Sequence, residues 1–209
     1  MKLHHNSSRI EAFSDGVFAF AATLMVVNFN MDGNLEFNKA SGVGFLSFAV
    51  SFFVLVSLWW VHYNFFRRNS YMDNWIILFN SILLFVALYY VFPLKTMVQS
   101  WMGEGGISSM NDLSNLFILY GIGFLLIFLC YSLMYFRAFK KTKSGKNSLL
   151  LYFYARHFGI FTMVSIVSIL AALLELWIRI GFPGWIYGLI GPLCYGHAQW
   201  FSKKYPGIL

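Results

Sequence analysis

The sequence predicts an all-α membrane protein with six transmembrane helices in each subunit. Three observations predict this class. Hydrophobic residues make up 59% of the 209 residues and charged residues only 11%, whereas a soluble domain carries roughly a quarter charged residues. Six apolar segments are long enough, at about 17–25 residues or more, to cross the hydrocarbon core as helices. The basic residues gather in every second connection between these segments, which is typical of a multi-pass membrane protein.

The six predicted helices follow one another with short connections. The third, fourth and fifth are longer than the hydrocarbon core requires, so we expect them to tilt or to extend beyond it. In chain order the predicted helices cover Ile10–Met31, Val43–Phe66, Trp75–Trp101, Leu113–Phe139, Leu151–Ile180 and Trp185–Phe201.

Helix-breaking and charged residues mark the ends of these segments. A basic turn, Arg67–Asp73, follows the second helix, and a basic loop, Lys140–Asn147, follows the fourth. Pro93 lies late in the third helix, where proline kinks a helix or ends it. Pro183 and Gly184 separate the fifth helix from the sixth. No connection is long enough for a soluble domain, so residues 1–209 are expected to form one six-helix subunit.

The loop charges predict the orientation of the chain in the cell membrane. With the N-terminus inside, twelve of the fifteen Lys and Arg residues fall on the inner side. The outer connections carry acidic residues instead, among them Asp32, Glu36, Glu104 and Asp112. Because cytoplasmic loops are enriched in Lys and Arg, both termini are expected to face the cytoplasm.

Several function classes find no support in the composition. The net charge is +7, and the basic residues lie beside the apolar segments. They form no separate basic domain, so we expect no nucleic-acid partner. Cys130 and Cys194 lie within apolar segments without nearby ligands, which predicts buried thiols and no metal site. The chain also lacks an H-E-x-x-H motif and a Gly-rich phosphate loop.

The first helix carries an unusual acidic residue. Asp15 lies about a turn and a half inside the helix, counted from Arg9. A carboxylate in the membrane is costly and is usually paired or faces water. Arg9 is six residues away and therefore projects from a different face. The partners of Asp15 are expected on other helices.

The second and third helices offer such partners at a similar depth. His62 and Asn64 lie near the cytoplasmic end of the second helix, and Asn80 lies near the cytoplasmic start of the third. One interpretation is a polar network that fixes the first helix in a conducting arrangement. The other is that these groups only hold the helices together, as polar side chains do in membranes.

The first helix also carries an apolar stripe. Phe20, Leu24, Val27 and Met31 fall within about 60° of one another, and Thr23 borders them. Ordinary helix packing explains such a stripe, and so does a hydrophobic pore constriction. Periodicity alone does not choose between these two interpretations.

The polar start of the first helix resembles a known family. Arg9-x-x-x-Phe13-Ser14-Asp15, followed by Gly-Val-Phe-Ala and Ala-Thr-Leu-Met-Val, is similar to the first helix of the transmembrane protein 175 family of potassium channels. His62, Asn80 and Pro93 resemble positions of its second and third helices. The resemblance is sharp over about the first hundred residues.

This resemblance implies a potassium-selective channel of moderate selectivity, a homotetramer in the lipid bilayer. The first helix of each subunit would line a central pore, and potassium would be the permeant ion rather than a cofactor. Phe20 stands where many relatives have Ile or Leu. The implied site comprises the constriction Phe20, Leu24 and Val27, the adjacent polar Thr23, and the polar network Arg9, Phe13, Ser14, Asp15, His62 and Asn80.

Two further functions compete with a channel. A proton-coupled secondary transporter would use Asp15 with His62 and Glu175 as a relay of titratable groups. An intramembrane enzyme would use Ser14, Asp15 and His62. Ser14 and Asp15 point about 100° apart on one helix, however, which disfavours a catalytic relay. No enzyme activity is therefore expected.

Overall fold

The computed structural model describes residues 7–27, 39–101, 109–143 and 145–208, and they form helices joined by turns. This confirms the predicted all-α class. The long helices are α1 (Ser7–Val27), α2 (Lys39–Arg68), α3 (Asn74–Trp101), α4 (Met110–Lys141) and α5 (Lys146–Leu173). The last part of the chain forms η1 (Ile178–Ile180), α6 (Phe182–Trp185), η2 (Ile186–Leu189) and α7 (Ile190–Lys204).

Four helices of the described chain are long and apolar enough to span a membrane. They are Gly42–Arg68, Asn74–Ser100, Met110–Lys141 and Lys146–Leu173. Helix α1 and the segment from α6 to α7 are not among them. The second, third and fourth predicted helices are confirmed as continuous helices, whereas the predicted total of six spans stays a prediction.

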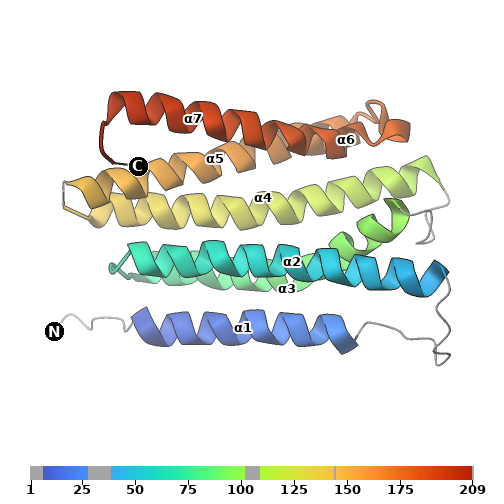
Figure 1. The fold of residues 1–209 in the computed structure, drawn as a ribbon, viewed down its shortest axis with the longest axis horizontal. Helices are drawn as coiled ribbons and strands as arrows, with labels where there is room; N and C mark the ends of the chain where they lie inside the picture. The colour runs from blue at the N-terminus through green and yellow to red at the C-terminus, as the bar shows by residue number, and fades with distance from the viewer. Residues whose placement is uncertain (1–6, 28–38, 102–108, 144, 209) are drawn as a thin grey trace.

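The fifth predicted helix ends earlier than expected. Helix α5 stops at Leu173, seven residues before the predicted end at Ile180. Glu175 and Trp177 adopt left-handed backbone angles, with φ of 51° and 46°. The chain reverses there so that α6 and α7 return over α5 (Figure 1). Glu175 and Arg179 are the charged residues of this otherwise apolar stretch.

The sixth predicted helix, Trp185–Phe201, is interrupted. A 3₁₀ segment, η2, separates α6 from α7, and α7 begins only at Ile190. Gly188 and Gly191 have low helix propensity. Pro192 has no amide hydrogen with which to continue the hydrogen-bond ladder. These residues explain why an apolar run does not become one straight helix.

The helices pack side by side in layers (Figure 1). Helix α1 lies at one edge against α2 and α3, α4 and α5 follow, and α7 lies at the opposite edge against α5. The largest core cluster links α1 to α5 through fully buried side chains, including those of Phe65, Leu83, Met134 and Leu151.

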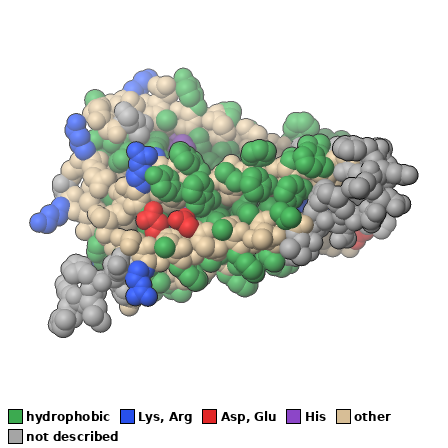
Figure 2. Space-filling view, turned by 60° about the horizontal axis from the view of Figure 1, so that its bottom comes forward, with side chains coloured by type: hydrophobic (Ala, Val, Ile, Leu, Met, Phe, Trp, Pro, Cys, Tyr) green, Lys and Arg blue, Asp and Glu red, His purple; other side chains and the backbone are tan. Residues whose placement is uncertain are grey.

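The two ends of the bundle differ in charge. Helix α1 begins and α7 ends at the same end of the molecule (Figure 1), which an even number of crossings requires. Most of the Lys and Arg side chains visible in Figure 2 lie toward one end, while hydrophobic side chains cover much of the remaining surface. Exposed apolar side chains such as Phe53, Phe85 and Met163 suit a surface that lipid covers.

Candidate functional site

One face of α1 is buried against α2 and α3. Ser14, Phe18, Ala21 and Met25 recur at helical spacing, and their exposed fractions are 0%, 5%, 2% and 5%. They fall within about 60° on the helix surface, so they form a single contact stripe. This stripe fixes which side of α1 points away from the rest of the subunit.

A chain of buried hydrogen bonds crosses the contact between α1, α2 and α3. The Asn80 amide on α3 donates to the Ser14 hydroxyl on α1 over 3.0 Å. The Asn80 carbonyl oxygen lies 2.7 Å from Nε2 of His62 on α2. Since the carbonyl accepts, His62 is the donor in this contact. Ser14 in turn donates to the Ile10 carbonyl over 2.8 Å. The structure thus brings Ser14, His62 and Asn80 together, as the sequence predicts.

Asp15 is joined to a different residue of α2. The indole nitrogen of Trp59 donates to the Asp15 carboxylate over 2.8 Å. Trp59 packs against Trp60 and Tyr63, with ring centroids 6.4 Å and 5.9 Å apart. The expectation that Asp15 has its partner on another helix is therefore confirmed. Trp59 as that partner was missed, although a Trp beside an intramembrane carboxylate supplies the required donor.

His62 is surrounded by aromatic rings. Phe18 and Phe66 lie with ring centroids 5.4 Å and 4.9 Å from the imidazole. Its Nδ1 atom is buried and has no hydrogen-bond partner. The buried imidazole thus connects α2 to α3 through Asn80 and packs against Phe18 of α1.

The remaining residues predicted for the network lie outside it. Arg9 and Phe13 are exposed, Phe13 by 66%, and no ion pair of Arg9 is found among the described residues. The Asn64 amide donates to the Trp60 carbonyl of its own helix over 2.8 Å. Because Arg9 and Phe13 project away from the buried stripe, contacts with the rest of this subunit do not explain them.

Of the predicted constriction residues, Phe20 and Leu24 have described side chains, and these lie on or beside the open side of α1. Phe20 is 57% exposed, Leu24 is half-buried, and Thr23 is exposed. The Thr23 hydroxyl donates to the Ala19 carbonyl over 2.7 Å. Val27 is the last residue of α1, and its side chain lies outside the described residues. Met31, which extends the predicted stripe, lies outside them as well. Phe20 and Thr23 are thus available to another molecule, a pore or lipid.

A second polar cluster ties the connection between α2 and α3 to α4. Asp73 accepts from the Ile76 amide at 3.0 Å and from the Arg137 guanidinium at 2.7 Å. The Tyr71 hydroxyl donates to the same carboxylate at 3.1 Å. Partial burial raises the pKa of Asp73, but the bonds from Ile76, Arg137 and Tyr71 outweigh it and leave the pKa lowered.

The sequence interpretation missed this cluster because it treated Arg67–Asp73 only as a basic turn. Asp directly before an apolar helix is an N-cap signal that could have identified Asp73. Its pairing with Arg137, 64 residues away, depends on how α3 and α4 pack.

The proposed relay of titratable groups is not assembled. Glu175 lies exposed in the turn after α5, at the end of the bundle opposite to the start of α1 (Figure 1). A relay of Asp15, His62 and Glu175 is therefore wrong in its third member. No group of three or more His, Cys, Asp or Glu side chains that could hold a metal ion is found in the described part of the chain.

Comparison with known proteins gives consistent similarities. The family model for the endosomal/lysosomal potassium channel TMEM175 matches residues 9–93, which begin at Arg9 and include all residues of the polar network. A curated potassium channel of Marivirga tractuosa is 37% identical over 147 residues, which are 64% of this chain and 60% of that protein. Matches to two further curated potassium channels span about half of their length.

Two solved structures resemble most of this chain. A variant of the potassium channel MtTMEM175 superposes with a TM-score of 0.79 and 31% identity, covering 93% of both chains. A lysosomal potassium-selective channel TMEM175 homolog from Chamaesiphon minutus superposes with a TM-score of 0.63 over 94% of this chain. At 19% identity, this second match concerns the fold alone.

Proposed function

Because the chain belongs to the TMEM175 family of potassium channels, we propose that copies of it assemble around a central axis and conduct potassium through a pore lined by α1. The assembly is a homotetramer in the cell membrane, with both termini in the cytoplasm. The excess of Lys and Arg at the end where α1 begins and α7 ends supports this orientation.

One observation carries the proposal: α1 is held by one face and leaves the opposite face open. The buried stripe through Ser14 and Phe18 is anchored to α2 and α3. Phe20 and Thr23 lie about 120° or more from Ser14 around the helix and are exposed in the single subunit. Helices from several copies can therefore meet around an axis without any subunit repacking its core.

The proposed constriction is apolar. Phe20, Leu24 and Val27 form successive rings toward the outer end of α1, and the Thr23 hydroxyl lies beside them. A narrow apolar ring penalises ions that hold water tightly, and Na⁺ holds water more tightly than K⁺. Without rings of charge or backbone carbonyls, the expected preference for potassium is moderate.

Within this proposal the polar network holds α1 rather than binding ions. Ser14, His62 and Asn80 lie on the buried side of α1, away from the open face. Asp15 is held by Trp59. Arg9 and Phe13 are exposed and are available for contacts between neighbouring subunits. The proton-coupled transporter has no comparable support, since Glu175 is remote from Asp15 and His62.

Cysteine accessibility tests which residues line the pore. Thr23→Cys is made in a Cys194→Ala background, because Cys194 is partly exposed whereas Cys130 is buried. Currents of the protein in planar bilayers should fall when a charged methanethiosulfonate reagent is added. Met163→Cys is the matched control, since Met163 is 62% exposed on α5. Loss of current in the control but not in Thr23→Cys would overturn the proposal.

A further inference from the structure

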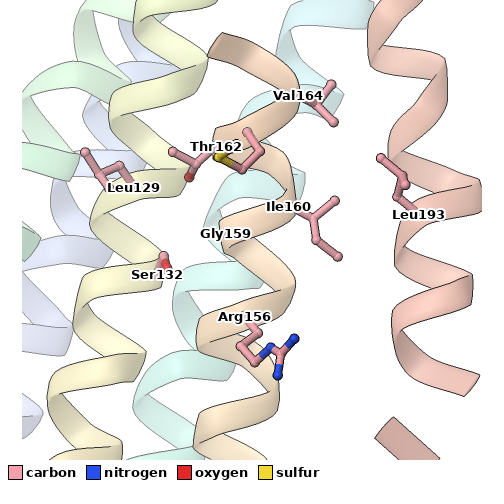
Figure 3. Close-up of a pocket in the computed structure, with 9 residues that line it drawn as sticks. Leu129, Ser132, Arg156, Gly159, Ile160, Thr162, Val164 and Leu193 are labelled. Atoms are coloured by element: carbon pink, nitrogen blue, oxygen red, sulfur yellow. The ribbon is translucent and has the colours of Figure 1, made fainter. Parts of the chain in front are cut away.

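An apolar groove lies on the side of the molecule away from α1. It has a volume of about 560 Å³ and is bounded by α4, α5 and α7. Figure 3 shows α5 between the other two helices, with Ile160 and Val164 directed toward α7 and Leu193 directed back toward α5. From Arg156 to Val164 the groove extends about 12 Å along α5, at 1.5 Å per residue.

The groove has a cationic end. Arg156 lines it in the first half of α5, whose start lies at the same end of the bundle as the end of α7 (Figure 1). The Arg156 guanidinium lies 4.7 Å from the centre of the Trp200 ring, and the Lys204 ammonium lies 5.1 Å from a Trp200 ring centre. Two cations thus share one indole, and tryptophan is the residue that favours the headgroup level of a bilayer.

No ion pair between these two cations and a carboxylate is found among the described residues. The Arg156 guanidinium has five N–H donors, and among the described residues it makes one long hydrogen bond, to the Tyr152 hydroxyl at 3.4 Å. Because Arg156 is exposed, most of its hydrogen-bonding capacity remains available to a ligand.

We propose that the groove binds an anionic phospholipid. The phosphate group lies on Arg156 and close to Lys204, because guanidinium binds phosphate oxygens through two parallel bonds. One acyl chain lies along Ile160, Val164 and Leu193 and covers apolar surface that water would otherwise contact. In a bilayer the phosphate of a lipid lies at the surface and its acyl chains lie deeper. The groove has the same arrangement, since its charged end lies toward the basic end of the bundle.

Gly159, next to Ile160, also lines the groove and has no side chain to fill it. A Cβ placed on Gly159 would meet only the Ser132 hydroxyl, at 3.8 Å, and no other atom within 4 Å. Open space therefore remains beside Gly159 on the α4 side of the groove, where Ser132 also lines it. We favour a lipid over a second copy of the chain as the occupant of the groove. Helix α1 lies at the opposite edge of the molecule (Figure 1), and in the proposed function it is α1 that faces the other copies. In this respect the inference rests on the proposed function.

Thermal stability in detergent measures lipid binding without any ion flux, because a ligand that binds only the folded protein raises Tm. Dioleoyl phosphatidylglycerol should raise Tm at lower concentration than dioleoyl phosphatidylcholine. Arg156→Gln should weaken the phosphatidylglycerol effect by about fivefold, the value of one basic residue at an anionic surface. Arg156→Lys should retain part of it, and Gly159→Leu should weaken binding of both lipids by filling the groove.

Arg67→Gln is the matched control, because Arg67 is exposed at the end of α2. This substitution removes one positive charge, as Arg156→Gln does, but at a site away from the groove. The proposal is overturned if Arg67→Gln and Arg156→Gln weaken binding equally, which would indicate unspecific charge attraction. It is also overturned if glycerol 3-phosphate without acyl chains raises Tm as well as the lipid does, or if Gly159→Leu changes nothing. Potassium flux into liposomes is a separate assay, so failure of the channel proposal would appear there and not in the lipid titration.

Discussion

The Asn80 amide on α3 donates a hydrogen bond to the Ser14 hydroxyl on α1, over 3.0 Å and across 66 residues of sequence. Through its carbonyl oxygen the same side chain contacts His62 on α2. Asn80 therefore occupies the junction of three helices and uses both ends of its amide there. The contacts of Asn80 therefore fix which face of α1 turns toward α2 and α3.

Asn80→Ala should destabilise the subunit by about 1–2 kcal/mol, since polar contacts between membrane helices contribute about that much. The replacement leaves both nitrogens of His62 without a partner. Unfolding in mixed micelles with increasing SDS measures the effect. Asn64→Ala is the control, because the Asn64 amide bonds only to its own helix. Equal stability of the two variants would contradict a joining role for Asn80.

Asp15→Ala and Trp59→Phe should each cost about 1.5–3 kcal/mol, the range for hydrogen bonds to charged groups. Both changes break the same 2.8 Å contact, so the double variant should lose less than the sum of the single losses. Asp15→Asn should be milder than Asp15→Ala, because its amide oxygen still accepts from the indole. Strictly additive losses would show that Asp15 and Trp59 act separately.

Phe20→Ala should raise the potassium conductance severalfold and reduce the preference for potassium over sodium. Removing the ring widens the proposed constriction, so hydrated sodium passes more easily. Single-channel currents and reversal potentials under exchanged ions measure both effects. Phe85→Ala, at a residue on α3 that is 73% exposed, should leave the reversal potential unchanged. An unchanged reversal potential in Phe20→Ala would remove Phe20 from the constriction.

Asp73 should make the stability of the protein depend on pH in the acidic range. Its pKa is lowered in the folded protein by bonds from Ile76, Arg137 and Tyr71, which outweigh its partial burial. A lowered pKa means that the stabilisation is complete above the unfolded pKa of about 3.9 and is lost as pH falls through the folded value. Wild type should therefore lose Tm more steeply than Asp73→Asn below about pH 4.

At pH 7 Asp73→Ala should cost about 1 kcal/mol or more, since it removes the N-cap of α3 together with the ion pair. Asp73→Asn should retain the cap, because asparagine also accepts from the Ile76 amide. If wild type and Asp73→Asn showed the same acid sensitivity, the carboxylate would have no special role at this connection.

The sequence predicted the site more completely than it predicted the last part of the fold. The motif around Ser14 and Asp15, with His62 and Asn80, identified three helices whose polar residues meet in the structure. The ends of the last two helices were wrong, because Glu175 and Arg179 are single charges in an otherwise apolar stretch, and the sequence does not show that the backbone reverses between Glu175 and Trp177. The Trp59 contact and the Asp73–Arg137 pair were missed, since each joins helices whose relative rotation composition does not reveal.

By itself, the sequence determined that this chain is a helical membrane protein and where most of its long helices run, because an apolar stretch and its flanking charges are local properties. It also located the family's polar motif at one end of the first helix. Only the tertiary structure decided which face of α1 is buried, which partner Asp15 has, and that a groove ends at Arg156. Those features arise from the rotation and packing of neighbouring helices, so they depend on contacts between residues far apart in the chain.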